Sequence, residues 1–377
     1  MSIVVALLGF NLLILVHELG HYLLARMVGI EAEVFSVGFG PAVIRIHGKR
    51  TLFQFALIPI GGYVRLAGMG REDEPEGRTA ERHHRHRRYD EASLWERALV
   101  VSAGPLFNFV FAIMAYTWLF GSFNAVAFEW KREATTVVKE VSGPALDAGL
   151  KAYDVIETIN GQEVRSFAEL KRLVGQNGHD KMTIVIARGP EAKAPPTRAI
   201  ETQFDGLILL WPDPPEDWER ITVSIDAQRT DRGYRLGVAP AFARFGATGM
   251  LSALHLGLEE TWVVTQTVFD ALGRWFRGSE DAEVASVVKI TEIGADTVKM
   301  GSEWFLSLLA ILSVNLGLLN LLPFPALDGG RLFFVLMEAV SRRPVPRQIE
   351  LIVHGVGMLI LLGFMAVVMF REIAEKF

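Results

Sequence analysis

The 377-residue sequence contains no cysteine, and only 21% of its residues are charged. Without thiols the chain has no disulfide framework, no thiolate metal site and no cysteine nucleophile, so any metal must be held by histidine or carboxylate side chains. The net charge of −5 gives no support for a nucleic-acid partner. Hydrophobic residues make up 50% of the chain, 35 glycines come in addition, and the mean hydropathy is +0.28. This excess excludes a disordered or fibrous protein and indicates a membrane protein.

Four stretches are apolar enough to cross a bilayer as helices, which takes about 20 residues each. They lie at residues 1–30, 98–122, 303–330 and 349–371. The first stretch could be mistaken for a signal peptide, but it lacks a basic n-region and a small-residue cleavage site. It also carries three ionisable residues inside the apolar run, so we expect a retained helix.

The segments between these spans differ in character. Residues 31–66 are apolar runs separated by glycine, which favours a β-hairpin lying against or dipping into the membrane. Residues 67–97 predict a polar loop, and its HHRHRR run at 83–88 is interpreted as a solvated juxtamembrane segment rather than a metal or nucleic-acid site. Residues 134–245 show strand patterns with one amphipathic helix and predict a soluble region. Residues 250–276 predict an amphipathic interfacial helix, with a fifth span as the alternative.

Basic residues indicate the topology of the four spans. The loop at 71–97 contains seven arginines, and the loop at 331–349 contains four more. By the positive-inside rule both loops are cytoplasmic. Both termini and the region 134–300 then lie on the outer side, which in a Gram-negative cell is the periplasmic side of the inner membrane.

The first span contains a pattern with metal-binding spacing. His17-Glu18-Leu19-Gly20-His21 is an H-E-x-x-H motif, and positions i and i+4 of a helix share one face. Two imidazoles there can hold one Zn²⁺ at about 2.0–2.1 Å. Glu18 can take a proton from water that the metal activates, which makes peptide hydrolysis feasible. Ionisable groups inside a spanning helix are costly and usually functional, so we favour a metal site over a polar patch at a helix end.

A catalytic zinc usually has three protein ligands and one open position, so two histidines leave the site incomplete. Asp328 is the best candidate for the third ligand, since it follows the third apolar segment in the run N-L-L-P-F-P-A-L-D-G-G at 320–330. The prolines end the helix, and the glycines let the backbone turn so that the aspartate can point inward. A helix cap is the alternative role for Asp328 taken alone.

These two motifs together resemble the site-2 protease family of intramembrane zinc metalloproteases, peptidase family M50, and within it the regulator-of-sigma-E protease type. The similarity covers nearly the whole chain, with a weaker stretch at 190–245. Further segments also resemble this family: V-G-F-G-P at 37–41 and P-I-G-G-Y-V at 59–64 in its membrane-reentrant β-hairpin, A-G-P-L-F-N at 103–108 in its second span, and residues 143–164 in its periplasmic PDZ domain.

The resemblance implies a polytopic α-helical membrane protein with four transmembrane helices, a membrane-associated β-hairpin region and a periplasmic α+β PDZ domain. It implies that His17, His21 and Asp328 bind Zn²⁺, and that Glu18 is the general base and then the proton donor to the leaving amine. Asn320 would lie near the scissile carbonyl and help to hold the substrate backbone or the developing oxyanion.

The resemblance also implies where the substrate binds. Asn108 would contribute to substrate handling, and the β-hairpin with Gly38, Gly40, Gly61 and Gly62 would pair with an unwound substrate strand. The expected substrate is a single-span membrane protein of the anti-sigma-factor kind, already trimmed by another protease, or a signal-peptide remnant. The PDZ domain would act as a size filter that blocks untrimmed substrates.

Two features leave alternatives open. Tyr153 stands where PDZ domains of this type usually have glycine, so whether the PDZ groove binds a peptide stays open. An inactive membrane adaptor that presents a PDZ domain is the alternative function, but a scaffold needs no general base. A metal transporter would need polar residues in several spans, and here they cluster at one site, with His354 in the fourth span as the exception.

Overall fold

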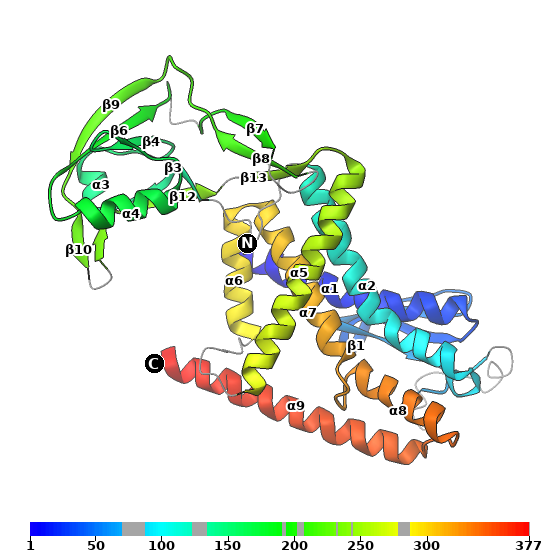
Figure 1. Cartoon of the computed structure of the whole chain (residues 1–377). Coiled ribbons are helices and arrows are strands. Elements are labelled where there is room, and N and C mark those ends of the chain that lie inside the picture. The colour runs from blue at the N-terminus through cyan, green and yellow to red at the C-terminus, as the bar shows by residue number, and fades with distance from the viewer. Residues whose placement is uncertain are drawn as a thin grey trace. The chain divides into compact units, whose positions relative to one another are not determined.

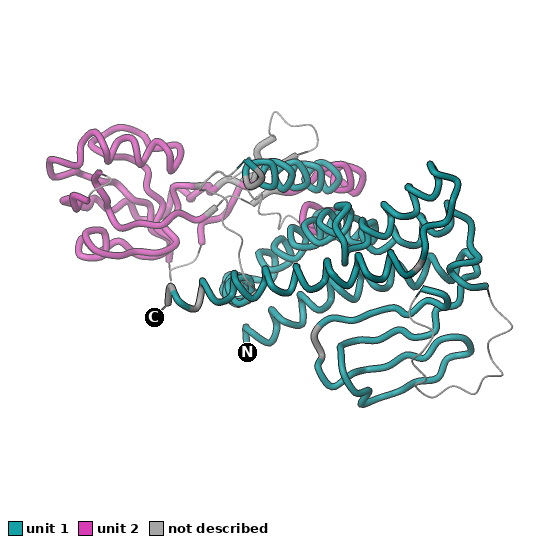
Figure 2. Tube along the Cα trace, turned by 90° about the horizontal axis from the view of Figure 1, so that it is seen from below, with its two compact units in different colours: residues 1–116, 257–377 teal, residues 117–256 magenta. Residues whose placement is uncertain are grey.

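The structure is a computed structural model that describes residues 1–69, 87–122, 134–190, 194–201, 207–230, 233–242, 244–277 and 287–376. The chain divides into two compact units, which Figure 2 colours separately. The helical unit comprises residues 1–116 and 257–377, and the β unit comprises residues 117–256. Most of the histidine-rich run at 83–88 lies outside the described residues.

The helical unit holds the candidate site. Figure 1 labels its elements, and helices α2 and α5 run from one unit into the other. In chain order its elements are α1 (Ser2–Met27), β1 (Ala32–His47), β2 (Leu52–Leu66), η2 (Tyr89–Glu91), α2 (Leu94–Gly121), α5 (Met250–Phe276), α6 (Val287–Met300), α7 (Ser302–Leu321), α8 (Asp328–Ser341) and α9 (Arg347–Lys376).

Four helices of the described chain are long and apolar enough to cross a membrane, which confirms that part of the expectation. They are α1, α2, α7 and the 348–371 part of α9. Helix α5 has the bounds expected for the amphipathic helix and is not among these four. The α9 stretch has only 6% of its span buried within the protein, so it presents most of its surface outward.

The third expected segment, 303–330, is two helices rather than one. Helix α7 ends at Leu321, and α8 begins at Asp328. Pro323 and Pro325 explain the break, because proline cannot donate a backbone hydrogen bond and disfavours helical geometry at the residue before it. The result is a short turn that places Asp328 at the first position of a new helix.

Strands β1 and β2 form an antiparallel pair in which both strands bend. Val34 pairs with Arg65 on one side and with Leu52 on the other, while Phe53 pairs with both Phe35 and Ile46. The pair therefore consists of four straight segments, which lie across the sheet in the order 62–66, 34–37, 52–55 and 44–47. Glycines with positive φ stand at the bends: Gly38 (88°), Gly40 (91°) and Gly61 (83°). Figure 2 shows this meander beside the helices.

Helices α1 and α2 approach closely next to the H-E-x-x-H motif. A Cβ atom at Gly20 would lie 2.8 Å from the carbonyl carbon of Ala103, so only glycine allows this separation. A buried apolar cluster secures the same helix ends to the start of the sheet. Its members are Ala25, Ile30, Ala32, Leu66, Tyr89, Ala92, Val100 and Val101.

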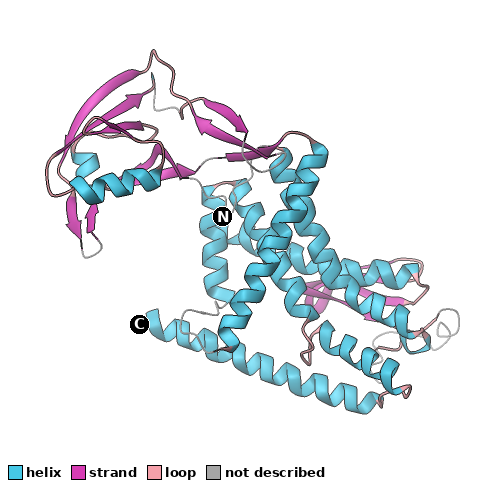
Figure 3. Cartoon of the chain, viewed as in Figure 1, coloured by secondary structure: helices cyan, strands magenta, loops and turns pink. Residues whose placement is uncertain are grey.

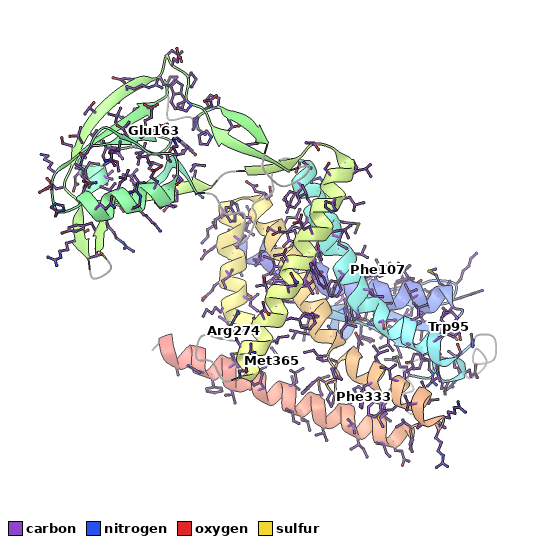
Figure 4. The ribbon with its side chains drawn as sticks, in the orientation of Figure 1. Trp95, Phe107, Glu163, Arg274, Phe333 and Met365 are labelled. Carbon is purple, nitrogen blue, oxygen red and sulfur yellow. The ribbon has the colours of Figure 1, made fainter. Side chains whose placement is uncertain are left out.

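The β unit is built around one sheet with two helices. The strands of this sheet are ordered β12-β3-β4-β6-β9, with β5 paired to β4, and a second sheet has the order β13-β8-β7. Its elements are β3 (Ala134–Val141), α3 (Gly143–Asp147), β4 (Val155–Ile159), β5 (Gln162–Glu163), α4 (Phe167–Asn177), β6 (Met182–Arg188), β7 (Thr197–Glu201), β8 (Leu207–Pro212), β9 (Glu219–Ile225), β10 (Gln228–Thr230), β11 (Gly233–Arg235), β12 (Val238–Phe242) and β13 (Arg244–Ala247). Figure 3 shows this strand-rich part, and Figure 4 marks it with Glu163.

A buried core holds the β unit together. Alternate residues of β6, namely Met182, Ile184 and Ile186, are fully buried, and they pack with Leu170 and Leu173 of α4. This alternation is the pattern of a strand with one face toward a core. The unit therefore has its own hydrophobic core.

The turn before β4 holds Tyr153 in a strained conformation. Its φ is +71°, a left-handed value that side chains other than glycine adopt at a cost of about 1–3 kcal/mol. The surrounding bonds fix the turn: Tyr153 N–H donates to the Val138 carbonyl at 2.6 Å, and the buried Asp154 carboxylate accepts from Lys151 N–H and from Arg188. Hydrogen bonding to Asp154 raises the pKa of the Arg188 guanidinium.

Replacing Tyr153 with glycine is expected to stabilise the β unit. The relief of strain, about 1–3 kcal/mol, outweighs the extra chain entropy of an unfolded glycine, about 0.5–1 kcal/mol, so we expect a net gain of up to about 2.5 kcal/mol. Hydrogen exchange of the β6 amides in the full chain measures this gain as slower exchange. Tyr153→Ala removes the same ring but keeps a Cβ atom, and equal slowing in both variants would contradict the explanation.

Candidate metal centre

Three side chains from two distant parts of the chain meet at one point. Nε2 of His17 lies 2.9 Å from Oδ2 of Asp328, and Nε2 of His21 lies 3.2 Å from the same oxygen. The two Nε2 atoms are 3.2 Å apart. In a tetrahedral zinc site with bonds of about 2.0–2.1 Å, neighbouring ligand atoms are about 3.3 Å apart. The three atoms are therefore already spaced as zinc ligands.

A backbone carbonyl fixes the protonation of His21. Nδ1 of His21 lies 2.8 Å from the carbonyl oxygen of Val100, an atom that can only accept, so Nδ1 carries the proton. The neutral ring then has its lone pair at Nε2, where it faces the carboxylate oxygen of Asp328. Two lone pairs at 3.2 Å repel each other unless a cation lies between them. This donor set is built to hold one, and the outer hydrogen bond orients the ligand.

Asn108 of α2 occupies the corresponding place behind His17. Nδ2 of its side-chain amide lies 3.1 Å from Nδ1 of His17, and the residue is fully buried. Among the described residues its Oδ1 has no hydrogen-bond partner. Turning the amide brings Oδ1 to Nδ1 of His17, which then donates and leaves Nε2 free for a metal. The structure thus places Asn108 against His17, and the substrate-handling role that the resemblance implied for Asn108 stays a prediction.

Gly104 of α2 leaves room for the ligand atoms. A Cβ atom at this position would contact Nε2 of His21 and would lie 2.7 Å from Nε2 of His17. Helix α2 therefore approaches the two zinc-side nitrogens as closely as a backbone can. A side chain at position 104 would fill the space beside these two nitrogens. Glycine leaves that space open, which is compatible with a bound ion.

Glu18 lies between the metal cluster and the sheet. Its Oε2 accepts a hydrogen bond from the backbone N–H of Val64 at 3.0 Å. Seven residues earlier on α1, Oδ1 of Asn11 accepts from the N–H of Gly61 at 2.8 Å. Two side chains of α1 thereby hold the edge segment of β2. One carboxylate oxygen of Glu18 is anchored, which leaves the other to exchange a proton.

The remaining predicted residues are distributed as follows. Gly62 lies beside Glu18, since a Cβ atom there would be 3.8 Å from Cγ of Glu18. Gly38 and Gly40 lie at the bend of β1, where the Gly38 carbonyl accepts from the Ser36 hydroxyl at 3.0 Å and a Cβ atom at Gly40 would meet open space. Asn320, near the end of α7, donates from its amide to the Leu316 carbonyl at 3.0 Å.

Several contributors could not be found from side-chain patterns. The Val100 carbonyl and the Val64 N–H are backbone groups, which no residue type signals. Asn11 and Gly104 carried weak signals: the first is a polar residue within an apolar span, and the second is part of the A-G-P-L-F-N run. A close approach of two helices is a property of the pair and is not encoded in either helix alone.

Comparisons with known proteins follow this geometry. The model of the family described as peptidase family M50 matches residues 5–364. A protein of Mesorhizobium japonicum named "Putative zinc metalloprotease" is 32% identical, covering 99% of this chain and 98% of that protein. A protein of Agrobacterium fabrum with the same descriptive name is 32% identical over 99% of this chain and 96% of its own length. One of Helicobacter pylori, again so named, is 31% identical over 96% and 97%.

Proposed function

Because this chain belongs to peptidase family M50 and is a zinc metalloprotease, we propose that it cleaves single-span membrane proteins inside the bilayer. The observation that carries the proposal is that Asp328, at the start of α8, meets His17 and His21 of α1 where α1 packs on α2, and both α1 and α2 are long and apolar enough to cross a membrane. A hydrolytic site built from such helices acts on a peptide bond that is itself within reach of the membrane interior.

The residues divide the chemistry between them. Zn²⁺, when bound by the three clustered side chains, is a Lewis acid that polarises a carbonyl group and lowers the pKa of water to about 7. Glu18 takes the proton from the attacking water and then passes it to the nitrogen of the leaving amine, so that the peptide bond breaks without a free charge. Asn108 and the Val100 carbonyl keep the two imidazoles in the orientation that exposes Nε2.

The sheet offers a place for the substrate backbone. The 62–66 segment pairs with the 34–37 segment on one side only, and its outer edge reaches Glu18 through Val64. An extended peptide that adds to this edge gains main-chain hydrogen bonds from backbone groups other than the Gly61 and Val64 amides, which α1 holds, and has its carbonyl groups near Glu18. A substrate helix must unwind first, because its carbonyl oxygens are otherwise occupied. Gly38 and Gly40 shape the sheet for this pairing, and Asn320 turns toward the scissile carbonyl.

The wider setting is part of the same proposal. The membrane is the bacterial inner membrane, the arginine-rich loops lie in the cytoplasm, and both termini and the β unit lie in the periplasm. The substrate is of the anti-sigma-factor kind or is a signal-peptide remnant. The β unit, as a PDZ domain, excludes substrates with large periplasmic parts.

Metal removal tests the proposal. Purified protein in detergent should cut a single-span reporter within its apolar segment, and mass spectrometry of the products locates the cut. Treatment with a chelator should abolish cleavage, and about one equivalent of zinc should restore it, because the three ligands define one site. Cleavage confined to the polar flanks of the reporter would contradict an intramembrane site, and cleavage that survives complete zinc removal would contradict the metal mechanism.

A further inference from the structure

A histidine lies within the apolar part of the fourth long helix, and the proposed mechanism leaves it unused. His354 is the one ionisable residue among positions 351–370 of α9, a stretch that is mostly exposed. An imidazole at this depth is costly and is retained only where it has a specific partner. Its partner lies in the turn that carries Asp328.

The contact is a single directed hydrogen bond. The backbone N–H of Ala326 donates to Nδ1 of His354 at 2.9 Å. Because Nδ1 accepts, the proton of the neutral ring is on Nε2, and among the described residues Nε2 is buried without a hydrogen-bond partner. The ring therefore leaves one hydrogen bond unmade, which is unfavourable, while it makes the other. The hydrogen bond from Ala326 therefore explains why a histidine stands at this position.

Ala326 has an unfavourable backbone conformation. Its φ is +79°, and it stands two residues before Asp328 in the turn between α7 and α8. An alanine in the left-handed region needs support from its surroundings. The turn has other bonds, from Phe324 N–H to the Leu322 carbonyl and from Leu327 N–H to the Phe324 carbonyl. The imidazole satisfies the amide of the residue with the least favourable backbone.

The helix face around His354 is shaped to this turn. Gly357, one helical turn later, is buried, and a Cβ atom there would lie 2.7 Å from the carbonyl carbon and oxygen of Pro325. Cε1 of His354 lies 3.3 Å from the position of a Cβ atom at Gly330, directly after the Asp328-Gly329 pair. Its ring also packs near Phe334 of α8, with centroids 5.7 Å apart. Figure 4 shows the side chains of α8 and α9, with Phe333 and Met365 labelled.

We propose that His354 is a positioning residue for the metal centre: it holds Ala326, and through Ala326 it aims Asp328 at His17 and His21. This inference rests on the proposed metal site. It assigns to α9 a task beyond anchoring in the membrane, because α9 then completes the site from outside the ligand set. The same bond makes the geometry of the third ligand depend on where α9 lies.

Two amide substitutions separate positioning from a general effect of losing the ring. In His354→Asn the side-chain oxygen sits where Nδ1 sat and can still accept from Ala326. In His354→Gln the oxygen extends to the place of Nε2, so the acceptor at Nδ1 is lost while the chemical group stays the same. His354→Ala removes both acceptors. Far-UV circular dichroism of the full chain verifies that each variant is folded.

The measurement is zinc affinity of the full chain in detergent, by competition with a chelator of known affinity. We expect His354→Gln and His354→Ala to bind zinc about 10–100-fold more weakly than wild type, as loss of an outer partner of a ligand does, and His354→Asn to stay close to wild type. Amide exchange at Ala326 in the metal-free protein should quicken in the first two variants alone.

Three results would overturn the inference, and they differ in what they imply. If wild type binds zinc but all three variants match it, the positioning role is wrong and the proposed function stands. If wild type binds no zinc, the proposed metal site is wrong, and the positioning role of the Ala326–His354 hydrogen bond is wrong with it. An equal loss in the Asn and Gln variants would show that the ring itself matters and not its Nδ1 acceptor, which also contradicts the proposal.

Discussion

The Glu18→Gln protein is expected to bind zinc as wild type does and to cleave a single-span reporter about 10²–10⁴-fold more slowly, the usual contribution of a general base. Glutamine keeps the length of the side chain, and its oxygen still accepts from Val64 N–H, so the edge of the sheet stays attached to α1. What it loses is the ability to take a proton from water. The substitution therefore removes one chemical step and leaves the metal ligands in place.

A contrasting variant makes this result interpretable. His21→Ala removes a proposed ligand and should lower zinc binding and cleavage together. Loss of cleavage with full zinc occupancy in Glu18→Gln, beside loss of both in His21→Ala, separates the base from the ligands. Equal cleavage by Glu18→Gln and wild type would mean a contaminating protease or another base, and the role assigned to Glu18 would be wrong.

The adaptor hypothesis makes the opposite prediction for wild type. A protein that only presents its β unit to partners would hold zinc without cutting the reporter. The structure instead places an ionisable carboxylate next to the metal cluster and fixes one of its oxygens to the sheet edge. A structural zinc site does not use a carboxylate that stays outside the ligand set. Burying such a carboxylate in an apolar helix would destabilise the protein without serving a function.

The sequence predicted the parts of the fold that depend on local pattern. Long apolar runs identified the four helices that are long and apolar enough to cross a membrane, since a helix in lipid needs only length and apolarity. The H-E-x-x-H spacing identified His17 and His21, because a helix fixes which residues share a face. Asp328 followed from the missing third ligand, and the structure brings it within 2.9 Å of His17.

Other parts depend on partners that the sequence does not name. The 303–330 segment was expected as one element, and although the prolines predicted an end to its helix, they carried no information on where α8 begins. Helix α6 was not expected, and the glycine-rich strands at 31–66 became two bent strands whose register only their mutual pairing sets. The contacts of the Val100 carbonyl and the Asn108 amide with the two histidines could not be predicted, because they depend on how α1 packs on α2.

The Gly104→Ala substitution tests that packing directly, and we expect it to weaken zinc binding at least about 100-fold, the upper range for disturbing the surroundings of a metal ligand. The added methyl group would contact Nε2 of His21 and lie 2.7 Å from Nε2 of His17, well inside van der Waals contact. Neither imidazole can retreat freely, because its Nδ1 is held at Val100 or Asn108. The rings must rotate away from the metal position, or α2 must move from α1.

Gly121→Ala is the matched control, since it adds the same methyl group to the same helix. A Cβ atom there would lie 3.7 Å from the nearest atom, Cβ of Ala253, which is ordinary contact. Alanine favours helix over glycine by about 1 kcal/mol in a helix interior, where Gly104 lies, and by less at Gly121, the last residue of α2. Propensity alone would therefore favour Gly104→Ala, and it cannot explain weaker zinc binding in that variant. Zinc affinity close to wild type in Gly104→Ala would mean that the helices separate at little cost. The closeness of α2 to the ligands would then be incidental, and the explanation of its glycine would have to be abandoned.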